Sequence, residues 1–249
     1  KYGAHISEIQ MPSQRISSEM IRNKLASGCD VSTYCPVSVT QYIRFHGLYD
    51  CDRLSQEEAK PPMKTSDMYA VLSACLRPKR YIHTLGVAMT AANLAEVHGC
   101  DSNQAYTAGL LHDCAKCLTD EKRLTICRKH HISITSVERK NPFLLHAKVG
   151  AYLAQKKYGV KNKDILNAIR NHTTGRQNMS TLEKIIFVAD YIEPGRAHAP
   201  ANLAEIRKLA FVDLDKALVR ILEETLNYLK NSDGDIDPMT EETWRCYQR

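Results

Sequence analysis

Hydrophobic side chains recur with a helical period through most of the chain, and no stretch shows the strict alternation of a half-buried strand. In the segment from about Lys79 to His98, one apolar face is made by Leu85, Ala88, Ala91, Ala92 and Ala95. The pattern predicts an all-α fold. Its helices are expected over residues 67–76, 79–98, 102–113, 119–130, 142–158, 162–171, 181–190, 203–211 and 214–230, with a short last helix after Pro238.

Turn-forming and capping residues mark where several of these helices begin and end. Arg77-Pro78 separates the first two, and Gly99 stops the second. Ser102 and Thr119 are expected to cap the next two helices through their hydroxyl groups. Asp237-Pro238 combines a capping side chain with a proline suited to the first helical position.

The chain is predicted to have three parts: residues 1–49 as a short separate unit, residues 50–64 as a linker, and residues 65–249 as the main helical domain. The linker is polar and contains Pro61-Pro62. Within the first part, helices are expected from Ser17 or Ser18 to about Ala26 and from Pro36 to Phe45.

The composition and the charge of the chain limit the kinds of function that it can have. With 43% hydrophobic and 25% charged residues, the composition is that of an ordinary globular protein. No apolar run is long enough to span a bilayer and no secretory leader opens the chain, so a cytoplasmic protein without membrane contact is expected. Nine cysteines, an odd number, fit a reducing compartment better than a disulfide framework. A net charge of +6 suits an anionic small-molecule substrate, whereas no basic stripe interleaved with aromatic residues indicates nucleic-acid binding.

The doublet His112-Asp113 follows an apolar run and is the strongest sign of chemistry. An isolated histidine in such a helix is more often a hydrogen-bonded core residue than a ligand, but a carboxylate buried there needs a cationic partner. The other candidate ligands lie in segments that are predicted to be separate helices: His83, His146, His172 and Asp190. We predict that these four histidines and two aspartates converge on a metal site inside the helical bundle.

This ligand set suffices for two first-row metal ions, among which iron, manganese, cobalt, nickel and zinc accept imidazole and carboxylate. Asp113 is the natural bridge, with His83, His112 and Asp190 on one ion and His146 and His172 on the other. Two neighbouring cations would lower the pKa of a bridging water, produce hydroxide at neutral pH and bind phosphoryl oxygens. The predicted reaction is hydrolysis of a phosphate ester or anhydride, with Asp113 in a catalytic role.

Further polar residues near the predicted ligands suit an anionic substrate. Lys116, one turn after His112, could place its ammonium group on a phosphate oxygen and so serve in catalysis and binding; the alternative is an ordinary surface lysine. Arg196 follows a Pro-Gly turn, where its guanidinium could hold a phosphate through two hydrogen bonds. The loop Thr173-Thr174-Gly175 is expected to direct its backbone amides toward the substrate.

Five short segments follow one another in order: Arg80-x-x-His83, His112-Asp113-x-Ala115-Lys116, His146-Ala147 with Gly150-Ala151, His172-Thr173-x-Gly175, and Ala189-Asp190-x-Ile192-Glu193-Pro194-x-Arg196. On these residues the chain from about 64 to 249 resembles the HD-domain phosphohydrolases, and within them the bacterial YqeK-type symmetrical dinucleoside tetraphosphatases. The resemblance implies an HD-domain helical bundle that cleaves diadenosine tetraphosphate into two molecules of ADP. It also implies a dinuclear centre of divalent or mixed-valence iron, and often a homodimer.

Residues 1–49 resemble the C-terminal end of nicotinate-nucleotide adenylyltransferases, through Ile16-Ser17-Ser18, Ile21-Arg22, Pro36, Val39, Tyr42-Ile43 and Gly47-Leu48-Tyr49. That family holds nucleotide phosphate with a Ser-Ser-Thr run at a helix start, where this chain has Glu19 in place of the threonine. The family's nucleotide-binding sheet and H-x-G-H-type motif are missing, and the chain begins with Lys1 rather than Met. The resemblance therefore implies the tail of a fused or associated adenylyltransferase that cannot transfer adenylyl groups alone.

Two other functions stay open on the sequence. HD folds host many chemistries, so the same metals could serve a nucleotidase or a phosphodiesterase acting on another nucleotide. The domain could instead be a nucleotide-binding module that serves the adenylyltransferase without catalysis. The complete ligand set favours an enzyme, because a binding module has no need for a dinuclear centre.

Overall fold

The computed structural model describes residues 16–27, 29, 31, 33–36, 39–40, 43, 48–50, 63–196, 202–232 and 234–248. The chain separates into two compact units, Lys1–Pro61 and Pro62–Arg249. The boundary falls within the segment expected to be a linker, of which residues 51–62 lie outside the described residues.

The first unit contains helix α1 (Ser18–Ala26) and a short 3-10 turn, η1 (Leu48–Asp50). Ser17 caps α1, in agreement with the prediction, because its hydroxyl accepts a hydrogen bond from the amide of Met20 at 3.1 Å. Leu25 and Val31 are buried in a small apolar cluster. The helix expected over residues 36–45 lies largely outside the described residues.

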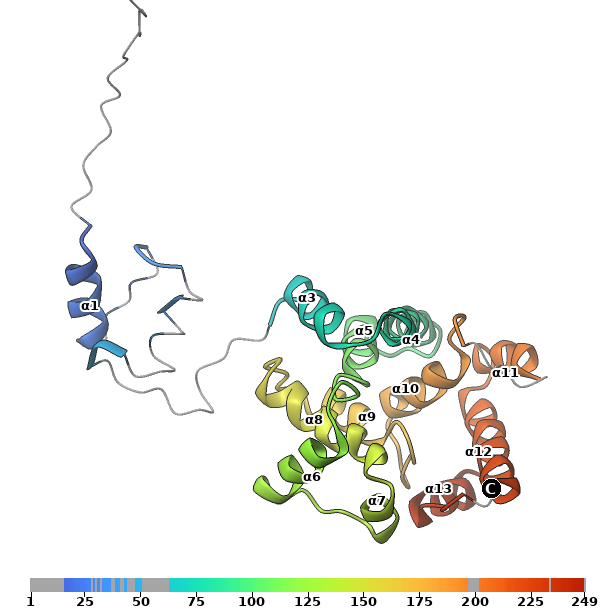
Figure 1. The fold of residues 1–249 in the computed structure, drawn as a ribbon. Helices are drawn as coiled ribbons and strands as arrows, with labels where there is room; N and C mark the ends of the chain where they lie inside the picture. Colours follow the sequence, from blue (N-terminus) through green and yellow to red (C-terminus); the bar gives the residue numbers. More distant parts are fainter. Residues whose placement is uncertain are drawn as a thin grey trace, which may run out of the picture. The chain divides into compact units, whose positions relative to one another are not determined.

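The second unit is a bundle of helices, and its described residues contain no strand (Figure 1). This confirms the all-α prediction. The elements are α3 (Thr65–Cys75), α4 (Pro78–Val97), α5 (Ser102–Leu111), α6 (Asp120–Lys129), α7 (Ser136–Lys140), η2 (Pro142–Leu145), α8 (His146–Lys156), α9 (Lys163–Asn171), α10 (Thr181–Ile192), α11 (Leu203–Ala210), α12 (Leu214–Asn231) and α13 (Pro238–Tyr247).

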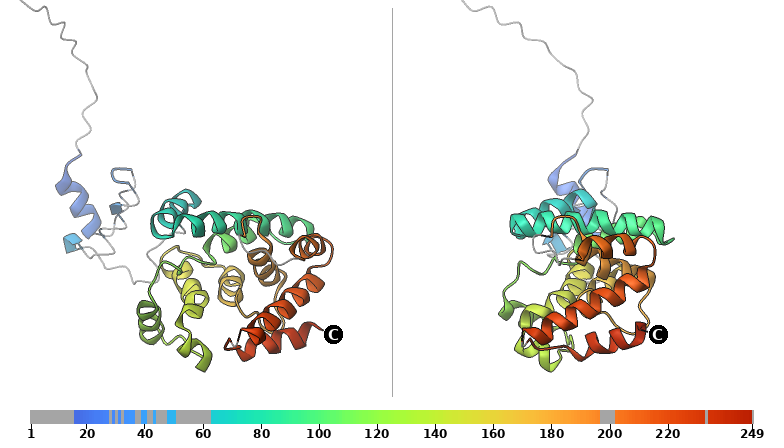
Figure 2. Two further views of the ribbon diagram at one scale, coloured as in Figure 1. Left: turned by 45° about the vertical axis from the view of Figure 1, so that its right-hand side comes forward. Right: turned by 90° about the vertical axis from the view of Figure 1, so that its right-hand side faces the viewer.

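Helix α5 packs against α4, α9 and α10, and α10 also packs against α4 and α9. Helix α12 packs on α10, with α11 and α13 at its two ends (Figures 1 and 2). The contact between α4 and α5 is especially close at Gly109. A Cβ atom at that position would lie 2.8 Å from the Cα of Ala88, so only glycine permits this approach. The close packing brings the helix that carries His83 against the helix that ends at His112.

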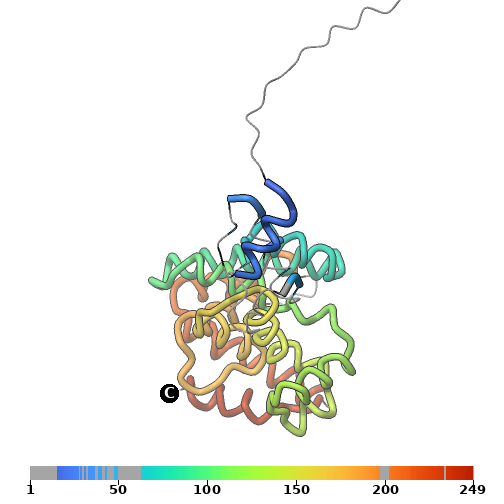
Figure 3. The backbone as a smooth tube through the Cα atoms, turned by 90° about the vertical axis from the view of Figure 1, so that its left-hand side faces the viewer, coloured from blue at the N-terminus to red at the C-terminus, as the bar shows by residue number. Residues whose placement is uncertain are grey.

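The main hydrophobic core lies between these helices. Of the apolar face predicted for α4, Ala88, Ala91 and Ala95 are fully buried, while Leu85 and Ala92 are half-buried. A smaller apolar cluster joins α6, η2 and α8. Figure 3 traces the chain from α5 out to α6 and α7 at one corner of the bundle and back into α8. No helix in the described part of the chain is long and apolar enough to cross a lipid bilayer.

Several helix boundaries and one helix differ from the prediction. The helix expected to reach Asp113 ends at Leu111, and the one expected from Pro142 begins as the 3-10 turn η2 and becomes α-helical at His146. The cap of α5 is Asp101 rather than Ser102, because the Asp101 carboxylate accepts hydrogen bonds from the amides of Asn103 and Gln104 at 2.9 and 3.0 Å. Ser102 is then the first helical residue. Helix α7, which was not predicted, is too short for a hydrophobic period to show; a capping box formed by Thr135 and Glu138 begins it.

Candidate metal centre

Three histidines share one arrangement at the ends of helices. His112 follows α5, His172 follows α9, and His146 lies where η2 passes into α8. In each case Nδ1 contacts the carbonyl oxygen three residues earlier, at 2.6 Å for His112 and 2.7 Å for the other two. Because a carbonyl oxygen only accepts hydrogen bonds, Nδ1 carries a proton, and in the neutral ring Nε2 is the nitrogen whose lone pair is left for a metal. All three side chains are buried.

In His83 the acceptor that holds Nδ1 is a carboxylate instead of a backbone carbonyl. Its Nδ1 donates to Oε1 of Glu193 at 3.0 Å, and Glu193, at the end of α10, is only 1% exposed. A buried acceptor of this kind fixes the orientation of the ring and leaves Nε2 available to a metal. Oδ1 of Asp190 lies 3.0 Å from Nε2 of His83 and 3.7 Å from Nε2 of His112.

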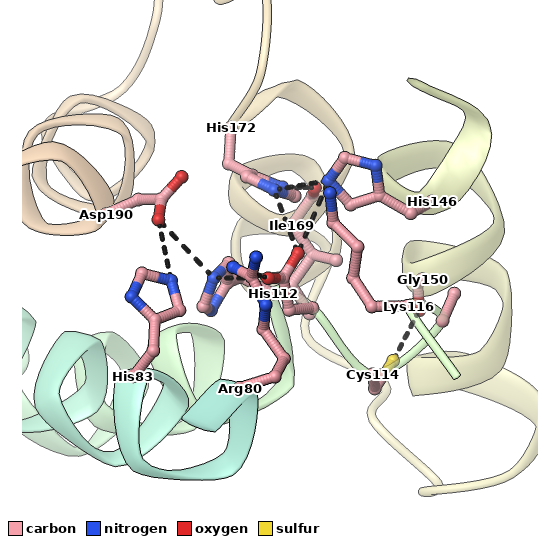
Figure 4. Close-up of polar contacts among 12 residues, drawn as sticks. Arg80, His83, His112, Cys114, Lys116, His146, Gly150, Ile169, His172 and Asp190 are labelled. Carbon is pink, nitrogen blue, oxygen red and sulfur yellow. Dashed lines mark hydrogen bonds and ion pairs between the residues drawn. The ribbon is translucent and has the colours of Figure 1, made fainter. Parts of the chain in front are cut away.

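Asp113 lies at the centre of the cluster. Its Oδ1 is 3.3 Å from Nε2 of His146 and 3.7 Å from Nε2 of His172, and its Oδ2 is 3.5 Å from Nε2 of His112. Nη1 of Arg80 donates a hydrogen bond to the same Oδ2 at 2.9 Å. The structure thus brings all the predicted ligand side chains into one cluster, although they come from separate helices and loops (Figure 4).

Several buried atoms of this cluster make no hydrogen bond within the described part of the protein, although they lie close to one another. Among the described residues, the buried Nε2 atoms of His83 and His112 and Oδ1 of Asp113 have no hydrogen-bond partner. Nε2 of His146 and Nε2 of His172 face each other at 3.1 Å, although neither carries a proton to donate. Imidazole and carboxylate lone pairs directed into one space are the donor set of a first-row metal. The residues therefore fit divalent metal ions.

The electrostatics of the cluster favour a cation. Burial disfavours the charged form of His112, but the carboxylates of Asp113 and Asp190 outweigh it and raise the pKa of His112 to about 9. Burial alone would raise the pKa of Asp113, yet the neighbouring imidazoles, His112 first, hold that pKa well below its usual range. Burial lowers the pKa of His146 well below its ordinary value, so this ring is neutral near pH 7. A field that favours a proton on His112 also attracts a metal ion.

Two groups of ligand atoms are each compact enough to hold one ion, with all atoms of a group within 4.8 Å of one another. They comprise His83, His112 and Asp190 in the first group and His112, Asp113 and His172 in the second. The first group has the composition predicted for one ion. His112 belongs to both groups, so the division of ligands between two ions stays a prediction.

Two residues of the cluster belong to the segments on which the resemblance rests, but the sequence prediction gave them no function of their own. Arg80 pairs with Asp113, and Glu193 holds His83. Each lies three residues from a predicted ligand along its helix, Arg80 before His83 and Glu193 after Asp190. Side chains at this spacing share a helix face, and that spacing is the signal that could have identified them.

Lys116 lies beside the cluster and is half-buried. Its side chain extends toward His146 and His172 (Figure 4). Burial lowers the pKa of its ammonium group, and the charge of Asp113 opposes that shift without cancelling it. Among the described residues the ammonium has no hydrogen-bond partner. A partly desolvated cation without an anion is suited to bind an anionic ligand.

Some polar groups of the loop after His172 make hydrogen bonds within the loop or to the end of α9. The amide of Gly175 donates to the carbonyl of Asn171 at 2.8 Å, and the hydroxyl of Thr174 donates to the carbonyl of Gly175 at 3.0 Å. The Gly175 amide therefore closes the end of α9 and is not available to a phosphate, contrary to the role expected for it. Thr173 is half-buried, and its hydroxyl has no hydrogen-bond partner among the described residues.

Arg196 is anchored just beyond α10. Its Nη1 donates to the carbonyl oxygen of Asp190 at 2.8 Å, and its guanidinium lies over the ring of Tyr191, 4.7 Å from the centroid. These contacts hold the guanidinium next to a predicted ligand. Its predicted contact with substrate stays a prediction.

Comparisons with known proteins agree with this geometry. The model of the HD domain family matches residues 80–195, a range that includes every predicted ligand. The chain is 43% identical over 178 residues to a Bacillus subtilis protein named symmetrical bis(5'-nucleosyl)-tetraphosphatase, and the match covers 72% of this chain and 94% of that protein. It is 33% identical over 175 residues to a Mycoplasma genitalium protein named probable nicotinate-nucleotide adenylyltransferase/Ap4A hydrolase, covering 68% of this chain and 49% of that protein.

A solved structure shows the same fold. The crystal structure of a predicted HD superfamily hydrolase involved in NAD metabolism, from Clostridium acetobutylicum, matches with a TM-score of 0.71 and 42% sequence identity. The match covers 74% of this chain and 97% of that one. This chain therefore belongs to the family of HD-domain proteins that includes the symmetrical bis(5'-nucleosyl)-tetraphosphatases.

Proposed function

We propose that this protein is a metal-dependent hydrolase that cleaves diadenosine tetraphosphate and related dinucleoside polyphosphates symmetrically. The main support is the buried cluster around Asp113, in which several nitrogen and oxygen atoms make no hydrogen bond to any described residue of the protein. The chain is also 43% identical to a relative named for this activity. Water adds to one of the two central phosphorus atoms, and the bond from that phosphorus to the bridging oxygen breaks. The leaving diphosphate carries away the electron pair of that bond, and the products are two molecules of ADP.

In this proposal Asp113 with His83, His112 and Asp190 would hold one ion, and Asp113 with His146 and His172 would hold the other. When bound, the ions supply Lewis-acid chemistry, polarising phosphoryl oxygens and activating water. The chain's own contribution is to hold the ligands in place. Acceptors on every Nδ1 fix the four imidazole rings, so their Nε2 atoms stay directed into the site.

Arg80 and Lys116 supply positive charge beside the ligands. Arg80 orients the carboxylate of Asp113 through its hydrogen bond to Oδ2. The Lys116 ammonium is free to bind a phosphoryl oxygen, on which negative charge is stabilised during hydrolysis. In this proposal the Thr173 hydroxyl and the Arg196 guanidinium contact the phosphate chain, whereas the proton of the Thr174 hydroxyl is already donated to the carbonyl of Gly175.

Product analysis tests the reaction. Anaerobically purified protein loaded with ferrous iron is incubated with diadenosine tetraphosphate, and the nucleotides are separated by chromatography. We expect ADP alone. AMP together with ATP would indicate asymmetric cleavage, and no turnover would indicate a different substrate or a binding module; either result contradicts the proposal.

Replacing the central carboxylate tests the site. Asp113→Asn keeps the shape of the side chain but removes the charge and the bridging capacity, so turnover should fall by at least about a hundredfold. The helical circular-dichroism spectrum should stay unchanged. Asp164→Asn, at an exposed aspartate of α9, is the matched control and should keep full activity. Comparable turnover in Asp113→Asn and the control would exclude the assigned site.

The proposal also includes iron as the metal, a homodimer as the assembled state and the cytoplasm as the location. Iron and the homodimer rest on the resemblance to the symmetrical tetraphosphatases, and the location rests on the scattered cysteines, which suit a reducing compartment. Metal analysis of anaerobically purified protein tests the first, with two iron atoms per chain expected under the two-ion proposal. Sedimentation equilibrium tests the homodimer, and cell fractionation tests the location. Zinc or manganese in place of iron would contradict the choice of metal, a monomer would contradict the dimer, and association with membranes would contradict the cytoplasmic location.

We further infer that residues 1–49 are the C-terminal part of an adenylyltransferase-like domain joined or bound to the hydrolase. Two observations support this: the residues that resemble that family, and the joint name of the Mycoplasma genitalium relative. An antibody against the helical unit, applied to extracts of source cells, should detect a band large enough for both domains or co-isolate the adenylyltransferase. A band of hydrolase size without that partner would contradict the inference.

A further inference from the structure

A cleft of about 590 Å³ adjoins the metal centre. It lies between the turn that connects α3 to α4 and the segment that follows His112-Asp113, and it is lined by Arg77, Arg80, Lys116, Leu118 and Arg123 among others. Arg80 joins the two sites, because this lining residue donates directly to Asp113. Arg80 and Lys116 therefore lie between the cleft and the predicted catalytic cluster. Its volume falls in the range of small-molecule sites, about 300–1,000 Å³.

The cleft carries excess positive charge. Arg123 is neutralised by an ion pair with Asp120, and its other guanidinium nitrogens bind the carbonyls of Ala115 and Lys116 at 3.3 Å. It is thus a structural support for the cleft wall. Arg77 and Lys116 have no side-chain hydrogen bond or ion pair among the described residues. Arg77 is therefore an unpaired cation at this cavity, and Lys116 adds a second positive charge on the side of the cluster, so the two attract an anion of more than one charge.

The remaining walls suit a nucleoside. Leu76 is buried, Leu118 is half-buried, and both contribute apolar surface to the cleft. A cavity with cations and apolar side chains fits a ligand that has a phosphate chain and a flat, weakly polar ring system. A nucleoside diphosphate has both, whereas inorganic phosphate would leave the apolar walls uncovered.

We propose that this cleft binds the nucleoside diphosphate that leaves in the reaction, with Arg77 as a specificity residue for its phosphates. This inference rests on the proposed function. The scissile phosphate lies at the cluster around Asp113, and the departing diphosphate extends past Arg80 and Lys116 to Arg77. The nucleoside then lies against Leu76 and Leu118. Arg77 binds the part of the substrate away from the reacting atoms, so it stabilises the ground state and the transition state alike.

Charge reversal at two neighbouring positions tests the assignment. Arg77→Glu places a negative charge in the cleft, while Lys79→Glu makes the same change at an exposed residue that does not line it. We expect Arg77→Glu to raise KM for diadenosine tetraphosphate and Kd for ADP by about tenfold or more, with kcat within about threefold of the wild type. Lys79→Glu should change KM, kcat and the Kd for ADP by less than about twofold. Arg77→Lys should recover most of the ADP affinity.

The outcomes separate this inference from the proposed function. ADP binding is titrated calorimetrically on the full chain, with inorganic pyrophosphate as a second probe that lacks the nucleoside. If wild-type protein yields ADP but Arg77→Glu and Lys79→Glu behave alike, the cleft assignment is overturned and the function stands. If the wild type does not cleave diadenosine tetraphosphate, the function fails, and the ADP titration still decides the cleft. Pyrophosphate binding as tightly as ADP would overturn the nucleoside contact.

Discussion

The position of His83 in the site depends on the Glu193 carboxylate and on two glycines that lie next to it. The Glu193 carboxylate accepts from Nδ1 of His83 at 3.0 Å and from the amide of Gly195 at 2.6 Å. The space for this carboxylate exists because Gly86, one turn after His83, has no side chain: a Cβ atom there would lie 2.5 Å from Oε2 of Glu193. The orientation of one predicted ligand thus depends on a glycine that contacts no metal.

Gly86→Ala should therefore weaken metal binding without touching a ligand. The added methyl group displaces the Glu193 carboxylate, His83 loses its acceptor, and metal affinity should fall by about tenfold to a hundredfold, as for other residues that orient ligands. Competition with a chelator of known affinity measures the change. Asn93→Ala, at an exposed position of the same helix, is the control. Metal affinity equal to that of the control would show that Glu193 does not position His83.

His112, Asp113 and Asp190 could be predicted from the sequence because each lies at or near the end of an apolar helical run. The contacts that hold these ligands could not be predicted, although the three-residue spacing already indicates that Glu193 shares a helix face with Asp190. Glu193 contacts a residue 110 positions earlier in the chain, and Gly86 matters only because that contact exists. A single sequence shows residue types along one helix, whereas the identity of a partner on another helix depends on how the helices pack.

At the scale of elements, the turn between α9 and α10 is held by one buried carboxylate. Glu183 is 2% exposed and accepts hydrogen bonds from Nε and Nη2 of Arg176, both at 2.7 Å. It also accepts from the side chain of Asn171 at 2.7 Å and from the amide of Ser180 at 2.8 Å. These contacts connect the end of α9, where His172 lies, to the start of α10, which carries Asp190.

Stability should therefore depend on the charge of Glu183. Burial would raise its pKa, but the hydrogen bonds from Arg176 and Ser180 outweigh burial and lower the pKa below its ordinary value of 4.5. A carboxyl group whose pKa is lower in the folded state stabilises the fold fully above its unfolded pKa, and this contribution is lost as the pH falls through the folded pKa. Glu183→Gln should cost about 2 kcal/mol at pH 7, less than a fully buried pair because Arg176 is 37% exposed.

Urea denaturation at several pH values measures this effect. The difference in unfolding free energy between wild type and Glu183→Gln should be largest near pH 7 and should shrink below about pH 4.5. Glu205→Gln, at an exposed glutamate of α11, should show little difference at any pH. A difference that stays constant down to pH 3 would mean that packing of the side chain, rather than its charge, stabilises the turn.

Most helices of the second unit were predictable because their apolar faces repeat over several turns. Hydrophobic periodicity does not predict an element whose position is decided by a few local hydrogen bonds. Helix α7 depends on a capping box rather than on a period, and Asp101 takes the cap from Ser102 because its carboxylate already reaches two amides. Short elements and single-residue boundaries depend on a few hydrogen bonds, which sequence periodicity does not report.

At the scale of the molecule, the metal centre joins helices that are far apart in the sequence. Its ligands come from α4, the end of α5, the start of α8, the end of α9 and α10. The cluster also gathers groups that repel one another, since Asp113 and Asp190 are both anionic and the Nε2 lone pairs of His146 and His172 face each other at 3.1 Å. A cation bound among them removes this repulsion and connects the helices.

Metal removal should therefore lower the stability of the whole second unit. A ligand that binds only the folded state stabilises it by about 2.7 kcal/mol at a hundred times its Kd, which corresponds to about 5–10 °C in Tm for a domain of this size. Calorimetry of metal-loaded and chelator-treated protein measures the shift, and reloading should reverse it. Asp113→Asn lacks the central ligand, so its Tm should be nearly the same with and without chelator. Equal melting of loaded and stripped wild-type protein would mean that the helices pack into this arrangement without help from a metal, and that the converging lone pairs serve another purpose.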